Sequence, residues 1–162
     1  MNTVLELIYK SFFLNKSEIA VRIYDNSWSY GELHHMSNRI ASFLLEKGIR
    51  KGDRVAVLMN KSIYLYAAII GIMRSGGVYV PLETKAPPLR LAKMLGDISP
   101  FCVFVDRLTA TNYQKIQQLL QQKNKAVFLD DTESKEYEKI DFEEISVKAL
   151  VDSPSIYPED LA

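Results

Sequence analysis

Histidine and cysteine are the residue types in this chain most able to act as metal ligands, bases or nucleophiles. His34 and His35 are its two histidines, and they are adjacent in a helical pattern. Side chains of adjacent helical residues point about 100° apart, so this pair cannot converge on one metal ion. We expect both at the helix surface. Cys102, the single cysteine, lies in a β-rich apolar segment, which favours packing over nucleophilic chemistry.

Two further features could contact a ligand. A phosphate loop needs its glycines after a strand and before a helix, whereas Gly76 and Gly77 follow a helical pattern and precede a strand. A turn is therefore the favoured interpretation. Asp106 ends a predicted strand, where it could touch a ligand. No Ser-His-Asp set, HExxH or CxxC motif is present, so we assign no catalytic, cofactor-binding or metal-binding residue.

Length and composition limit the class of protein. The chain has 162 residues, enough for one domain or one large subdomain with a core. Its 20 basic residues balance 20 acidic ones, which argues against a nucleic-acid partner. The longest stretch without a charge, 62–73, is too short to cross a membrane. A single cysteine is typical of a reduced, cytoplasmic protein.

Hydrophobic periodicity predicts helices that alternate with strands. The expected helices are 3–14, 31–47, 62–75, 88–98, 109–122 and 141–149, and the expected strands are 19–24, 28–30, 54–59, 78–82, 101–105 and 126–129. Strands separated by helices pair in parallel, so the fold class is α/β, a mostly parallel sheet flanked by helices. The helix at 62–75 is apolar on nearly every side, which indicates burial on more than one face.

Local signals refine three of these elements. The first helix is expected to be capped by Asn2 or Thr3. Its apolar face is expected to hold Val4, Leu7, Ile8 and Phe12. Asp25 and Asn26 are turn formers between two short strands and predict a hairpin.

The last part of the chain differs in composition. Residues 130–144 hold eight acids and two lysines, which is typical of a solvated surface loop. Pro154 and Pro158 make 153–162 an extended linker. We therefore expect one α/β subdomain over 1–152, followed by this linker.

Four motifs occur in a fixed order over residues 28–100. The run W-S-Y-G-E-L at 28–33 resembles the L-T-Y-x-E-L opening motif of the adenylate-forming superfamily, which includes peptide-synthetase adenylation domains, acyl-CoA synthetases and luciferases. The run M-R-S-G-G-V-Y-V-P-L at 73–82 resembles the second motif, L-K-A-G-x-A-Y-V-P-L-D. Residues 48–57 are similar to the segment G-V-x-x-G-D-x-V-A-I, and 90–100 to R-L-x-x-M-L-x-D-x-x-P. The residues of the second motif, Y-V-P-L at 79–82, most resemble those of nonribosomal peptide-synthetase adenylation domains.

The resemblance implies a scaffold role for this stretch. In the family, the residues that bind ATP and the acyl substrate come later in the chain, and so does the catalytic lysine. The final residues here resemble the P-x-D-L-A that precedes the family's phosphate loop. We therefore carry over no site residue. The resemblance implies ATP and Mg²⁺ as cofactors of the complete enzyme only, and as partners the complementary C-terminal part and a carrier protein. The sequence departs from the family at Glu83, at Arg74-Ser75 and at 87–89.

Three alternatives remain open from the sequence. The chain could be the N-terminal piece of an acyl-CoA ligase, since those enzymes use close variants of the same motifs. It could be a degenerate, non-catalytic interaction module. It could also be an unrelated α/β binder of nucleotides or small molecules with accidental motif matches.

Overall fold

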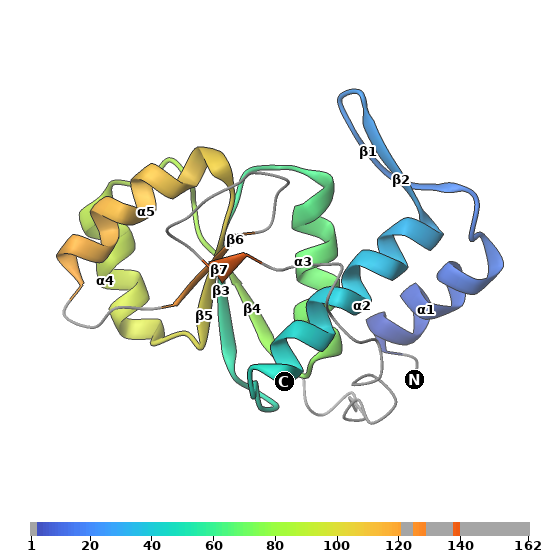
Figure 1. Cartoon of the computed structure of the whole chain (residues 1–162), viewed down its shortest axis with the longest axis horizontal. Coiled ribbons are helices and arrows are strands. Elements are labelled where there is room, and N and C mark those ends of the chain that lie inside the picture. Colours follow the sequence, from blue (N-terminus) through green and yellow to red (C-terminus); the bar gives the residue numbers. More distant parts are fainter. Residues whose placement is uncertain (1–2, 121–124, 129–137, 140–162) are drawn as a thin grey trace.

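The computed structural model describes residues 3–120, 125–128 and 138–139 (Figure 1). The helices are α1 (Val4–Leu14), α2 (Tyr30–Glu46), α3 (Ile63–Arg74), α4 (Pro88–Ile98) and α5 (Arg107–Leu119). The strands are β1 (Ile19–Ile23), β2 (Asn26–Ser29), β3 (Arg54–Leu58), β4 (Val78–Pro81), β5 (Cys102–Val105), β6 (Ala126–Phe128) and β7 (Glu138–Lys139). No helix in these ranges has the length and hydropathy of a membrane-crossing segment.

The main sheet has five strands in the order β4-β3-β5-β6-β7, and every neighbouring pair is parallel. This confirms the predicted fold class. The chain moves from β3 to β4 on one side and then returns to place β5 on the other side. The carboxyl ends of β3 and β5 therefore form the switch point of the sheet, which is where open α/β sheets commonly bind ligands.

Helices cover both faces of the sheet. Alternate residues of each strand face opposite sides, so Val55 and Val57 pack in the core beneath α2 and α3. Ala56 and Leu58 pack in the second core beneath α4 and α5. Figure 1 shows α4 and α5 on one side of the strands, with α3, α2 and α1 following one another outward on the other. The hairpin of β1 and β2 projects from this outer part.

The first helix matches its predicted bounds and its predicted cap. The Thr3 side chain accepts a hydrogen bond from the Glu6 backbone, and the Glu6 carboxylate accepts one from the Thr3 backbone. The predicted apolar face was wrong in part. Leu5 and Phe12 are the buried residues of α1, whereas Val4 and Leu7 are exposed. The helix is apolar on two sides, so periodicity alone could not identify the side that packs.

The hairpin turn also differs from its prediction. Asn26 pairs with Ile23 as part of β2, so the turn consists of Tyr24 and Asp25 instead of Asp25 and Asn26. Tyr24 has φ 53°, a left-handed conformation that favours asparagine or glycine over tyrosine. Turn propensity therefore pointed one residue too far along the chain.

The start of α2 is fixed by a second capping box. The Glu32 carboxylate accepts hydrogen bonds from the Ser29 backbone at 2.7 Å and hydroxyl at 2.8 Å, and these bonds lower the pKa of Glu32. Gly31 lacks the positive φ of a tight turn. Its Cβ would instead lie 3.0 Å from the Lys16 carbonyl oxygen, so a side chain here would require Lys16 to shift.

The closest helix contact lies where α2 crosses α3. A Cβ on Gly71 would lie 2.6 Å from Cγ2 of Ile40 and 2.9 Å from the carbonyl oxygen of Ser37. Ile40, Ser37 and the flanking Leu44 are buried. Burial of α3 on more than one face, as predicted, follows from its position between α2 and the sheet. The close approach itself was not predicted.

Strand β4 forms one edge of the described sheet. The backbone N–H groups of Val78 and Leu82 donate to the carbonyls of Asp53 and Val57 on the β3 side. Because N–H groups alternate sides along a strand, those of residues 79 and 81 face away from β3. Residue 81 is proline, which has no N–H. The side chains of Val78 and Tyr79 are exposed.

Glu138 and Lys139 form β7, parallel to β6, inside the stretch that we predicted to be a loop. That prediction was wrong for these two residues, because pairing with a neighbouring strand outweighed their polar composition. The predicted helix at 141–149 and linker at 153–162 lie outside the described residues.

A pair of glycine substitutions tests the helix crossing. We expect Gly71→Ala to lower the free energy of unfolding by about 2–3 kcal/mol, because the new methyl group overlaps Ile40 and the Ser37 backbone. Gly96→Ala is the matched control in α4, where a Cβ meets nothing within 4 Å. It should stabilise by about 0.5–1 kcal/mol through helix propensity. Urea unfolding followed by the fluorescence of Trp28 measures both, and equal effects would contradict the crossing.

Candidate functional site

Polar side chains meet at the carboxyl edge of the sheet. Asp106 directly follows β5, Asn60 lies just beyond β3 and Thr84 just beyond β4. The Asp106 carboxylate accepts hydrogen bonds from the Asn60 backbone N–H at 2.6 Å and from its side-chain amide at 3.1 Å. Thr84 donates to the Asn60 side-chain oxygen at 3.2 Å. The ends of three strands are thus joined at the switch point.

The same carboxylate begins α5. Asp106 is the N-cap residue of this helix and accepts a hydrogen bond from the Thr109 backbone at 2.8 Å. The Thr109 hydroxyl donates a hydrogen bond to the carbonyl oxygen of Leu58 at 2.7 Å, which links α5 to β3. Asp106 is only 8% exposed. The Asp106 carboxylate therefore accepts its hydrogen bonds from donors within the chain. It acts as a structural junction between the end of β3 and the start of α5.

Sequence reasoning singled out Asp106 only as a residue that could touch a ligand, and it missed the partners that hold the carboxylate in the structure. The missed residues are Asn60, Thr84 and Thr109. One signal was available, because an aspartate followed three residues later by threonine at a helix start is a capping pattern. The bonds to Asn60 and Thr84 join residues far apart in sequence, so no local pattern could reveal them.

The two histidines have different surroundings. His35 is exposed, as predicted, but His34 is half-buried, which corrects our expectation of two surface residues. The ring of His34 packs on Phe12 of α1, with centroids 4.8 Å apart. Burial, and next the charge of Arg74, lower the pKa of His34. Across the described residues, no group of three His, Cys, Asp or Glu side chains is arranged to hold a metal ion.

Gly76 and Gly77 lie at the opposite edge of the sheet from Asp106. Gly76 has φ 81° and turns the chain from α3 into β4, which confirms the predicted turn. A Cβ on Gly77 would lie 2.9 Å from Cδ1 of Ile49, so this glycine is packed against a side chain. Neither is placed at the start of a helix where a phosphate would bind.

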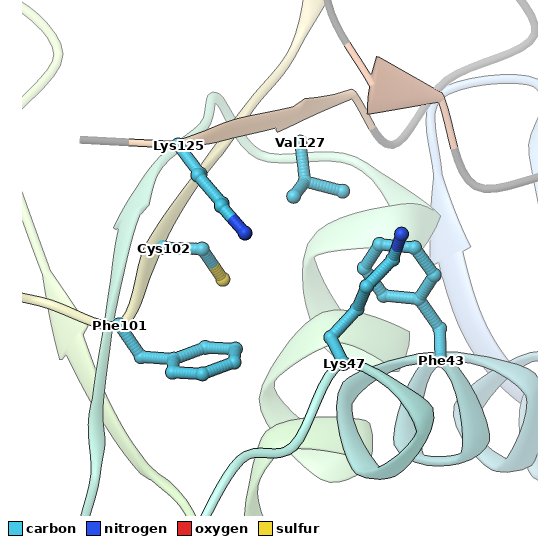
Figure 2. Close-up of a pocket in the computed structure, with 6 residues that line it drawn as sticks. All are labelled: Phe43, Lys47, Phe101, Cys102, Lys125 and Val127. Atoms are coloured by element: carbon cyan, nitrogen blue, oxygen red, sulfur yellow. The ribbon is translucent and has the colours of Figure 1, made fainter. Parts of the chain in front are cut away.

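Cys102 is buried, as predicted, at the start of β5. Figure 2 shows its sulfur and the ammonium of Lys125 pointing into a space between β5, β6 and α2. The other lining residues are Phe43, Lys47, Phe101 and Val127. The cavity has a volume of about 10 Å³, the room of one water molecule, whereas small-molecule sites occupy about 300–1,000 Å³. It is too small for a nucleotide or an acyl substrate.

These observations define a doubly wound α/β scaffold whose ligand-side polar residues are engaged with one another. Among the described residues, Asp106 is the buried carboxylate at the switch point, and the hydrogen bonds that it accepts from Asn60 and Thr109 leave it poorly suited to hold Mg²⁺.

Comparison with known proteins identifies the scaffold. The family described as AMP-binding enzyme matches residues 14–162, and the chain belongs to this family. It is 36% identical over 104 residues to the nonribosomal peptide synthetase ungA' of Aspergillus campestris, a match covering 64% of this chain and 1% of that protein. It is 32% identical over 96 residues to gramicidin S synthase 2 of Brevibacillus brevis, covering 59% of this chain and 2% of that one.

Solved structures agree with the sequence matches. The chain superposes on the nonribosomal peptide synthetase FmoA3 with a TM-score of 0.78 and 27% identity, over 96% of this chain and 15% of that one. A benzoate CoA ligase from Burkholderia xenovorans has the same fold, with a TM-score of 0.75 over 94% of this chain and 29% of that one, at 18% identity. The resemblance to the N-terminal part of a peptide-synthetase adenylation domain is confirmed. The chain spans only a small part of each relative.

Substitution of Asp106 tests the junction. We expect Asp106→Ala to lower the free energy of unfolding by about 2–4 kcal/mol, because a helix cap and charged hydrogen bonds are lost together. Asp106→Asn should lower the free energy of unfolding by less, because the asparagine oxygen can still cap α5. Some loss remains, because its NH₂ group cannot accept from the Asn60 N–H. Asp97→Ala, at an exposed position of α4, is the control and should stay within about 0.5 kcal/mol of the parent. Equal stability of all variants in urea unfolding would contradict the junction.

Proposed function

We propose that this chain is the N-terminal scaffold of an amino-acid-adenylating ligase. The complete enzyme would join a carboxylate to ATP, release pyrophosphate and pass the acyl group of the acyl-adenylate to a carrier-protein thiol. In this proposal the chain has no activity by itself and needs the complementary C-terminal part of the adenylation domain. ATP and Mg²⁺ would be cofactors of the assembled enzyme.

The observation that carries the proposal is the combination of family motifs with an occupied switch point. The motif at 28–33 builds the capping box of α2, and the motif at 73–82 builds the turn into β4. Both are structural roles. Asp106, the residue best placed to meet a ligand, is held by Asn60 and Thr109. The chemistry would therefore come from residues that this scaffold supports.

An acyl-CoA ligase is the second candidate. The benzoate CoA ligase from Burkholderia xenovorans shares the fold of this chain, with a TM-score of 0.75. The two candidates differ in the acceptor of the acyl group, which would be coenzyme A in this case and a carrier protein in the first.

Amino-acid-dependent exchange of pyrophosphate into ATP tests the proposal. The chain would be assayed alone and mixed with a second chain that carries the rest of an adenylation domain, taken from gramicidin S synthase 2. We expect exchange only in the mixture. Asp106→Ala should reduce that exchange more than Asp97→Ala, because the first loosens the scaffold and the second does not.

Other outcomes separate the alternatives. Exchange by the chain alone would contradict the assignment of a scaffold role. Exchange that depends on aryl or fatty acids, followed by transfer to coenzyme A, would favour the acyl-CoA ligase. Stable association with the second chain but no exchange with any of these acids would favour the non-catalytic interaction module.

A further inference from the structure

His34 lies at the centre of the contact between α1 and α2. Its ring packs on Phe12 at 4.8 Å, on Phe13 at 6.0 Å and on Tyr9 at 6.2 Å between centroids. All three aromatic residues belong to α1. The imidazole of α2 thus fills the space among the aromatic side chains that attach the first helix.

Among the described residues, the charged groups that act on this imidazole are cationic. Arg74 of α3 lies over the Tyr9 ring at 4.5 Å, and its Nε and Nη1 are buried without a hydrogen-bond partner. The positive charges of His35, on α2, and of Lys16, which follows α1, also lower the pKa of His34. No carboxylate from the described residues acts on it. The charges of these described residues therefore disfavour protonation of His34.

The side-chain amide of Asn38 lies 3.3 Å from Nε2 of His34. In this orientation the amide nitrogen donates to an unprotonated Nε2. The Asn38 oxygen is buried without a hydrogen-bond partner, and rotation of the amide would let it accept from a protonated Nε2. The neutral imidazole is therefore favoured by its aromatic packing and by the nearby cations, and not by this hydrogen bond.

The attachment of α1 is narrow enough for one group to matter. Leu5 and Phe12 are its buried side chains, and Ile8 and Tyr9 are half-buried. Val4, Leu7, Phe13 and Leu14 are exposed. Figure 1 shows α1 at the outside of the molecule, against α2.

We propose that α1 is held by an acid-sensitive contact, in which protonation of His34 releases the helix from α2 and α3. In the released state the imidazole is solvated and titrates near its ordinary value of about 6.5. In the docked state its pKa is lower. The free energy that docks α1 therefore has its full value above about pH 6.5, and it decreases as the pH falls below that value. The inference is independent of the proposed enzymatic function.

Hydrogen exchange of the backbone amides measures the release. We expect the opening of α1, relative to that of α5 in the same chain, to increase by up to about tenfold for each pH unit below 6.5. For both helices, each observed exchange rate is divided by the intrinsic rate of that amide at the same pH. His34→Gln should remove this dependence, because glutamine does not titrate, whereas His35→Gln should retain it. Arg74→Met should weaken the dependence, because it removes the cation nearest the contact.

A direct titration in the unmodified chain covers the case in which His34→Gln fails to fold. The chain has two histidines, so His35→Gln assigns their ring resonances in NMR spectra. We expect His34 to titrate below 6.5. Titration of His34 at or above 6.5, or exchange of α1 that follows α5 at every pH, would overturn the proposal. A dependence that disappears in His35→Gln would also overturn it.

Discussion

The close crossing of α2 over α3 determines how one whole side of the molecule is built. Gly71 allows the backbone at Ser37 to approach α3 more closely than any side chain would permit. Ile40 then enters the core as a fully buried residue. Helix α1 and the hairpin pack against both α2 and α3, through contacts such as Tyr9 with Arg74 and Trp28 with Tyr64, so the crossing sets the surface on which they lie. A local change at Gly71 would therefore be transmitted outward through α2 to α1.

The other side of the molecule is organised by hydrogen bonds at the carboxyl edge. Asp106 joins the end of β3 to the beginning of α5, and Thr109 continues the connection to Leu58. In many open α/β sheets this edge holds a ligand. Here the chain uses it to maintain its own strands in register. The strand ends at this edge are therefore joined to one another by hydrogen bonds of the chain itself.

Much of the fold could be predicted from periodicity and helix caps. All five described helices and every strand from β1 to β6 were expected at nearly their observed positions, because burial of apolar residues at regular spacing determines them. Errors arose where the deciding contact is distant in sequence. Val4 and Leu7 were assigned to the packed side of an evenly apolar helix, and His34 was assigned to the surface. The partners Phe12 and Arg74 that surround His34 come from two other helices. Family motifs identified the scaffold, yet the Asp106 junction could be found only in the folded structure.

Proline at position 81 has a consequence for the behaviour of the exposed sheet edge. An unpaired edge strand is a template on which another chain can add a strand, and repeated addition leads to fibrils. Along the outward side of β4 the N–H of Tyr79 is followed by a proline, so a regular ladder of donors is interrupted after one position. An incoming strand could not form a continuous backbone pairing there. The molecule thus carries a built-in barrier to ordered polymerisation at an edge that also exposes the side chains of Val78 and Tyr79.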